Sequence, residues 1–156
     1  MMTGSGVHAV CPSCGAINRI PPDRPAERAK CGTCHKPLFA GKPVMANAET
    51  FERHITRNGI PVLVDFWAPW CGPCLAMAPA FERAAAELEP DYRLLKVNTE
   101  EEQSLAARYG IRSIPTLMLF MGGREIARRP GASDTRGIVS WAKAQINNRQ
   151  ASASAN

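Results

Sequence analysis

The six cysteines of this 156-residue chain form three pairs, each with two residues between the cysteines. A thiolate is both a nucleophile towards disulfides and a ligand for metal ions, so the surroundings of each pair decide its chemistry. Cys71 and Cys74 lie between an apolar run and a segment whose apolar residues recur every three or four positions. The other two pairs lie near the N-terminus, where no long apolar pattern occurs. We therefore expect two different kinds of site.

Cys71 and Cys74 stand at the predicted start of a helix. Unpaired backbone N–H groups and the positive end of the helix dipole stabilise a thiolate there, and Pro73 fits a first turn, where its missing N–H is not needed. Side chains three residues apart on a helix lie within reach of a disulfide. We expect Cys71 to attack a substrate disulfide and Cys74 to resolve the mixed disulfide. The alternatives are a structural disulfide, or half of a metal site that would need other donors.

Asp65 is the candidate base for this dithiol. It lies six residues before Cys71, inside an apolar run over 61–67 that predicts a buried strand. Burial would raise the pKa of an unpaired carboxyl group towards that of a general base, which Cys74 needs. The alternative is a residue at a strand edge that reaches solvent, and the sequence leaves both interpretations open.

The two N-terminal pairs have the spacing of a zinc site, with 16 residues between Cys14 and Cys31. Each pair supplies two thiolates, so Cys11, Cys14, Cys31 and Cys34 predict one tetrahedral zinc ion, and we expect no organic cofactor. His35 can replace one cysteine ligand or simply be solvated. Two structural disulfides or a second redox dithiol are the remaining interpretations.

The basic excess of the chain belongs to its N-terminal part. Residues 1–43 hold six Lys and Arg side chains against two acidic ones, whereas the remainder holds 13 basic and 12 acidic side chains. Zinc-bound thiolates would offset much of this excess, and only Phe39 offers an aromatic ring near the cysteines. We therefore expect no nucleic-acid partner.

The sequence also predicts where the protein acts. It has no run near the roughly 20 apolar residues that a membrane span requires, and its first ten residues lack a basic and an apolar region. We expect no secretory signal, no membrane partner and a cytoplasmic location, where thiols stay reduced.

Composition divides the chain into an N-terminal module (residues 1–43), a main domain (44–148) and a small polar tail (149–156) that we expect to be disordered. The patterning predicts a mixed sheet flanked by helices, which is an α/β or α+β sandwich, and we expect the α/β class. The predicted strands span 61–67, 92–97, 116–121 and 124–129. The predicted helices span 48–57 after the cap Asn47, 72–88, 100–109 before Gly110, and from the cap Asp134 to about residue 147.

Two segments resemble thioredoxins: VDFWAPWCGPC at residues 64–74 and YGIRSIPT at residues 109–116. The resemblance covers roughly residues 44–147 and implies the thioredoxin fold. It also implies that Pro115 follows a cis peptide bond and faces the dithiol, although Xaa-Pro statistics alone favour trans. The implied apolar docking surface for substrates consists of Trp70, Gly72, Pro73, Ile114, Pro115, Gly131 and Ala132.

Three further positions are compared with thioredoxins. Lys96 matches a lysine near the buried aspartate, and Lys96 and Trp67 are candidates for tuning the site, against the alternatives of a solvated lysine and a packing tryptophan. Thioredoxins often have a lysine after the second cysteine, where this chain has Leu75. This departure removes a positive charge near the dithiol and therefore bears on its redox potential. The dithiol mechanism does not depend on that charge.

The N-terminal module resembles that of the zinc-containing bacterial thioredoxin 2 type, in which the metal site is associated with redox sensing. The resemblance implies a protein-disulfide reductase that receives electrons from an NADPH-dependent flavoprotein thioredoxin reductase and passes them to disulfide-containing proteins. One alternative is a zinc-ribbon module that binds nucleic acid or a protein partner, with secondary redox activity. Another is a secretory oxidase or isomerase, which the missing signal and the Gly-Pro between the cysteines oppose.

Overall fold

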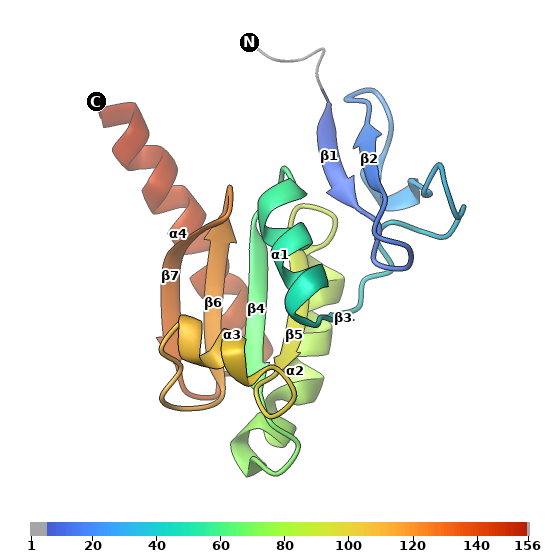
Figure 1. The fold of residues 1–156 in the computed structure, drawn as a ribbon. Coiled ribbons are helices and arrows are strands. Elements are labelled where there is room, and N and C mark those ends of the chain that lie inside the picture. Colours follow the sequence, from blue (N-terminus) through green and yellow to red (C-terminus); the bar gives the residue numbers. More distant parts are fainter. Residues whose placement is uncertain (1–5, 156) are drawn as a thin grey trace.

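The computed structural model describes residues 6–155, and side chains as far as residue 150. Its centre is a five-stranded mixed sheet in the order β3-β5-β4-β6-β7, in which β3, β5 and β4 are parallel and β6 and β7 are antiparallel to their neighbours (Figure 1). The strands are β3 (Val44–Met45), β4 (Val62–Trp67), β5 (Arg93–Asn98), β6 (Thr116–Met121) and β7 (Arg124–Pro130). The predicted mixed sheet is confirmed.

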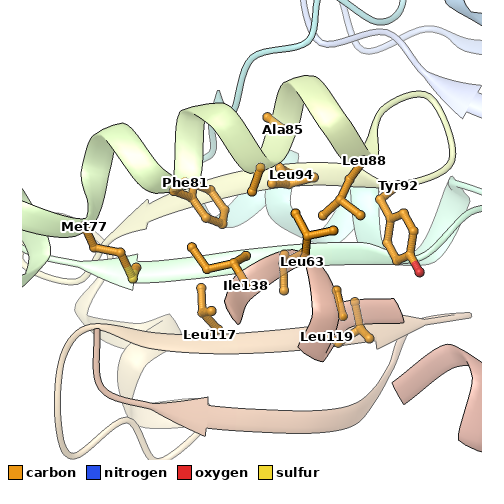
Figure 2. Packing of buried hydrophobic residues seen from close by; sticks show 13 residues of the cluster. Leu63, Met77, Phe81, Ala85, Leu88, Tyr92, Leu94, Leu117, Leu119 and Ile138 are labelled. Carbon is orange, nitrogen blue, oxygen red and sulfur yellow. The ribbon is translucent and has the colours of Figure 1, made fainter. Parts of the chain in front are cut away.

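Helices cover both faces of this sheet (Figure 1). On one face, α1 and α3 pack against the even-numbered residues of β4, including Val64 and Phe66. On the other face, α2 and α4 pack against Leu63, as Figure 2 shows with Phe81 of α2 and Ile138 of α4. The helices are α1 (Ala48–Arg57), α2 (Gly72–Leu88), α3 (Gln103–Arg108) and α4 (Thr135–Ala155).

The helix starts follow the predicted capping residues. The Asn47 side chain accepts a hydrogen bond from the Thr50 backbone N–H, and Asp134 accepts one from Gly137 at 2.8 Å. The helix predicted over 100–109 is shorter, but Gly110 follows it with φ +61°, the left-handed conformation typical of a helix end.

The last helix is longer than expected. We predicted a disordered tail over 149–156, but α4 continues to Ala155, and residue 156 lies outside the described residues. No glycine or proline follows Gly137, and alanine favours helix, so nothing in the sequence ends α4 near residue 147. None of the helices described is both long and apolar enough to cross a bilayer.

The N-terminal module packs beside α1 (Figure 1). Its antiparallel strands β1 (Val7–Val10) and β2 (Ile17–Ile20) are followed by a 3₁₀ turn, η1 (Ala26–Arg28). The module has a small apolar core of its own, which includes Leu38, Phe39 and the cysteines Cys11 and Cys31, and this core reaches Ile60 of the main domain.

Candidate functional site: a dithiol and a four-cysteine cluster

The dithiol lies at the N-terminus of α2, directly after strand β4. Cys71 is the N-cap residue of α2, and its Sγ accepts a hydrogen bond from the Cys74 backbone N–H at 3.2 Å. The two cysteines are joined by a disulfide, with Cα atoms 5.2 Å apart. Both side chains are nearly buried. The sequence predicted this placement, which brings a backbone N–H group of the first helical turn, that of Cys74, to the sulfur of Cys71.

The loop before β6 lies against this disulfide. The Ile114–Pro115 peptide bond is cis, and the Ile114 carbonyl oxygen lies 3.7 Å from Cys71 Sγ. The Gly131 backbone N–H donates to the Pro115 carbonyl oxygen at 2.9 Å, which ties the end of β7 to the same loop. Gly131 has φ +96°, a conformation that a side chain would strain. Residues far apart along the chain thus meet beside one sulfur atom.

An exposed apolar rim surrounds the nearly buried disulfide. Trp70 is 68% exposed and Leu75 is 53% exposed, and Gly72, Pro73 and Gly131 are also exposed. An exposed tryptophan beside a disulfide offers a large apolar contact area to another chain.

Asp65 is buried in the middle of the sheet, so the alternative of a solvent-exposed edge residue is wrong. Like Leu63, it lies on the face of β4 that α2 covers, the helix that carries Cys74. Neither carboxylate oxygen has a hydrogen-bond partner among the residues described. Burial raises the pKa of Asp65 to about 7, although the positive charge of Lys96 lowers it in part. A carboxyl group of this pKa exchanges protons near neutral pH.

Lys96 and Trp67 both lie beside this acid. Lys96 is the register partner of Asp65 on the adjacent strand β5, and its Nζ lies 4.6 Å from the centre of the Trp67 ring. Trp67 also packs against the buried group of Ala68, Cys71 and Cys74. Trp67 and Lys96 therefore link the environment of the carboxyl group to that of the disulfide.

The second site is the cysteine cluster of the N-terminal module. The sulfur atoms of Cys11, Cys14, Cys31 and Cys34 all lie within 4.8 Å of one another, and the Cys11–Cys34 and Cys14–Cys31 sulfur pairs are each 3.6 Å apart. With Zn–S bonds of about 2.3 Å, a tetrahedral site has sulfur–sulfur distances of about 3.8 Å. The four sulfurs therefore fit around one tetrahedral ion, and the two N-terminal pairs converge on a single site.

The two halves of this cluster have the same backbone turn. The Gly15 N–H donates to the Cys11 carbonyl oxygen at 3.0 Å, and the His35 N–H donates to that of Cys31 at 2.9 Å. Gly15 and His35 occupy equivalent positions, with φ of +80° and +67°. The His35 side chain is exposed and outside the cluster, which favours the interpretation of a solvated histidine.

Asn18 is a site residue that the sequence analysis missed. Its Nδ2 donates to Cys31 Sγ at 3.4 Å, while its Oδ1 accepts from the Gly32 N–H at 2.8 Å. Hydrogen bonds from the Cys34 backbone and from Asn18 lower the pKa of Cys31 to about 5. A lone asparagine in a short strand gave no signal of this contact, which joins residues 13 positions apart.

The chemistry of the donor set also favours a cation. The Ala16 backbone lowers the pKa of Cys14, but burial and the other three cysteines outweigh this effect and raise it to about 11. Four thiols this close cannot all ionise without a positive charge among them, and a divalent metal supplies that charge. The cluster is a metal-binding site.

Comparison with known proteins adds two family matches. Residues 42–144 match the family described as thioredoxin, and residues 10–36 match the family described as the N-terminal part of thioredoxin 2. The first match contains the dithiol, and the second contains all four cysteines of the cluster.

Individual relatives agree with these matches. The chain is 40% identical to thioredoxin C-3 of Corynebacterium nephridii over 90% of its own length and 97% of that protein. It is 49% identical to thioredoxin 1 of a Nostoc strain, over 53% of this chain and 78% of that protein. Among solved structures, a mutant thioredoxin of Halobacterium salinarum is similar with a TM-score of 0.62 and 30% identity, over 69% of this chain and 93% of that one.

Proposed function

The chain belongs to the thioredoxin family, and from this premise we propose a role for each residue of its two cysteine sites. The protein is a thiol–disulfide oxidoreductase that reduces disulfides in other proteins. Cys71 is its attacking thiolate and Cys74 its resolving thiol. The observation that carries this assignment is the position of Cys71 as N-cap of α2, with its sulfur at the N–H groups of the first turn.

The reaction proceeds in two exchanges. The Cys71 thiolate attacks one sulfur of a substrate disulfide, a mixed disulfide forms, and the other substrate sulfur leaves as a thiolate and takes up a proton. Cys74 then loses its proton and attacks Cys71 Sγ, which releases the second substrate sulfur. Two electrons pass to the substrate, and the enzyme is left with the Cys71–Cys74 disulfide described above.

Asp65 is the general base of the second exchange. Cys74 is nearly buried, so its thiolate is disfavoured until a base accepts the proton. A carboxyl group with a pKa of about 7 accepts that proton at neutral pH and returns it to solvent without a large free-energy gap. Lys96 and Trp67 set this pKa through charge and through the exclusion of water.

Substrates dock on the rim around the disulfide. One side consists of the exposed residues Trp70, Gly72 and Pro73, and the other consists of exposed Gly131, half-buried Ile114 and buried Pro115. Two contacts support this assignment. The hydrogen bond from the Gly131 N–H to the Pro115 carbonyl oxygen joins two residues of the second side, and the Ile114 carbonyl oxygen lies 3.7 Å from Cys71 Sγ. The Ile114 backbone pairs with an extended substrate segment, as the resemblance to thioredoxins implies.

Zinc is the ion of the four-cysteine cluster. Four thiolates in a closed tetrahedron favour Zn²⁺ over Mg²⁺ or Ca²⁺, which prefer oxygen ligands. Cys11, Cys14, Cys31 and Cys34 would hold it. Bound zinc supplies structural cross-linking there, and oxidation of its thiolates would release it. No feature of the described residues favours the alternative of a nucleic-acid-binding module.

The cellular context completes the proposal. Residues 1–43 form the zinc module and residues 44–148 the thioredoxin domain. An NADPH-dependent flavoprotein thioredoxin reductase returns the disulfide to the dithiol. Action in the cytoplasm agrees with the free thiols of the cluster, since a reducing compartment keeps such thiols available for metal.

An insulin-reduction assay on the wild type and Cys71→Ser, with zinc measured in the same samples, tests both sites. We expect the substitution to abolish reduction and to leave about one zinc per chain. The matched variant Cys74→Ser should trap a mixed disulfide with the substrate, visible by mass, because Cys71 still attacks. Reduction that persists in Cys71→Ser would overturn the assignment of the nucleophile.

A further inference from the structure

A buried arginine joins the N-terminal module to the thioredoxin domain. Arg93, the first residue of β5, is fully buried. Its Nη2 donates to the carbonyl oxygens of Val10 at 3.1 Å and Leu38 at 2.7 Å, both in the module. Its guanidinium also lies 4.5 Å from the centre of the Phe39 ring. One side chain of the thioredoxin domain thus contacts three residues of the N-terminal module.

The two carbonyl groups belong to opposite halves of the cysteine cluster. Val10 immediately precedes Cys11, and Leu38 follows Cys34 by four residues. Both oxygens reach the same nitrogen atom only when the two halves lie together. The same arrangement of the two halves brings the four sulfurs within 4.8 Å of one another.

Glu89 completes this contact from the end of α2. Its Oε2 accepts from Arg93 Nη1 at 3.0 Å, and its Oε1 accepts from the Gly41 N–H at 2.8 Å, in the segment that leads out of the module. The side chains of Arg93 and Glu89 are 1% and 2% exposed. A buried ion pair that loses a partner is strongly destabilised, because a charge remains without compensation.

The backbone around Val10 is held from the other side as well. The Val10 N–H donates to Asn58 Oδ1 at 2.9 Å, and the Gly59 N–H donates to the His8 carbonyl oxygen at 2.9 Å. The strand that leads into Cys11 is therefore fixed on both sides by residues of the thioredoxin domain.

We propose that Arg93, paired with Glu89, couples metal binding in the N-terminal module to the stability of the thioredoxin domain. When the cluster loses its metal, the two halves separate and the Val10 and Leu38 oxygens leave the guanidinium. Arg93 then keeps a buried charge with fewer acceptors, so the ends of α2 and β5 become less stable. Thermodynamic linkage is reciprocal, so an intact Arg93 contact strengthens metal binding.

The first test uses the unaltered chain. All three tryptophans, Trp67, Trp70 and Trp141, lie outside residues 1–43, so their fluorescence reports on the thioredoxin domain alone. Thermal unfolding is followed with Zn²⁺ bound and after anaerobic removal by a chelator. We expect the tryptophan-detected midpoint to fall by several degrees without metal. An unchanged midpoint would overturn the coupling.

The second test assigns the coupling to Arg93. Zn²⁺ affinity is measured by competition with a chromophoric chelator in Arg93→Met and in the control Arg108→Met, which removes the exposed ion pair with Glu52. We expect roughly 10- to 100-fold weaker binding for Arg93→Met and no measurable change for the control. The rise in midpoint caused by zinc should also shrink in Arg93→Met. Wild-type affinity in folded Arg93→Met would contradict the role of Arg93.

Arg93→Lys is a milder substitution that is used in case Arg93→Met does not fold. It keeps the buried charge beside Glu89 but has a single nitrogen, which cannot serve Glu89 and the two module carbonyls as Nη1 and Nη2 of Arg93 do. A smaller loss of zinc affinity than in Arg93→Met is expected. If neither variant folds, the unaltered chain still decides the coupling. Failure of the wild type to take up Zn²⁺ would overturn the proposed ion and this inference with it, whereas normal uptake without linkage overturns the coupling alone.

Discussion

The dithiol and the metal cluster begin from the same local motif. In both Cys71–Cys74 and Cys11–Cys14, the first sulfur accepts a hydrogen bond from the backbone N–H of the second cysteine, at 3.2 Å and 3.4 Å. The difference lies in what faces each pair. Cys11 and Cys14 face the sulfurs of a second such pair, whereas Cys71 faces the Ile114 carbonyl group and an exposed rim.

This contrast shows that the spacing of two cysteines supplies a turn and not a function. Four clustered thiolates share one cation and need no contact with another protein. A single thiolate at a helix N-terminus, with one neighbouring sulfur, stays reactive and exchangeable. The following experiments test how far the two sites differ.

The largest expected effect comes from breaking the cluster. Cys11→Ser replaces a thiolate with a hydroxyl group that zinc binds poorly, so we expect zinc content near zero after dialysis against a chelator. Structural zinc contributes about 10–16 kcal/mol of binding free energy in small modules. Insulin reduction, measured well below the lowered unfolding midpoint, should persist because Cys71 and Cys74 remain. Loss of insulin reduction in a folded Cys11→Ser variant would show that the activity of the dithiol depends on the metal cluster.

The next largest effect is expected at the dithiol, whose reaction needs a general base. The metal cluster needs no such base. Asp65→Asn removes the proton acceptor of Cys74, and we expect resolution of the mixed disulfide to slow by about 10²- to 10⁴-fold. Stopped-flow measurement on a disulfide substrate separates attack from resolution. Glu52→Gln, an exposed change on α1, is the control. A normal rate of resolution in Asp65→Asn would remove Asp65 from the mechanism.

The same variant has a pH signature. The pKa of Asp65 is about 7 in the folded protein and near 3.9 when unfolded, so the folded state binds the proton more tightly. The stability of the wild type should therefore fall as pH rises from about 4 to about 7 and then level off.

In Asp65→Asn this fall should be absent, a difference of about 2 kcal/mol between roughly pH 5.5 and 8.5. Urea unfolding at several pH values measures it. Parallel pH profiles for variant and wild type would contradict a raised pKa.

The smallest expected effect concerns Asn18, which lies beside the cluster. Asn18→Ala removes the amide that donates to Cys31 Sγ, and we expect zinc affinity to fall about tenfold, since partners of metal ligands typically contribute this much. Competition with a chromophoric chelator measures the change, and reduction by the dithiol should be unaltered. An unchanged affinity would mean that the backbone donors alone stabilise Cys31.

Much of the architecture was predictable because its signals are local. The apolar run of β4, the caps Asn47 and Asp134, and the pairing of β6 with β7 across Gly122 and Gly123 all depend on neighbouring residues, and the structure has each of them. The prediction of a disordered tail was wrong, because small polar residues do not by themselves end a helix and no glycine or proline follows Gly137.

The candidate site was predictable in part. Cysteine spacing indicated both sites, and the apolar neighbours of Asp65 indicated its burial without deciding between the buried and the exposed interpretations. Asn18 and Arg93 gave no signal, since each acts through a contact that the sequence does not encode locally. Glu89 and Arg93 have helical i, i+4 spacing, but Glu89 is the C-cap of α2 and Arg93 is the first residue of β5.

The sequence by itself determined the turn at each cysteine pair, the helix that starts at Cys71 and the strand that carries Asp65. These features follow from backbone preferences and side-chain patterns over a few residues, which act in any context. Only the tertiary structure decided which sulfurs meet, that Asp65 is buried on the face of the sheet that α2 covers, and that Arg93 reaches Val10, 83 positions away. Such contacts depend on how the packed layers bring distant segments together, and no local preference specifies them.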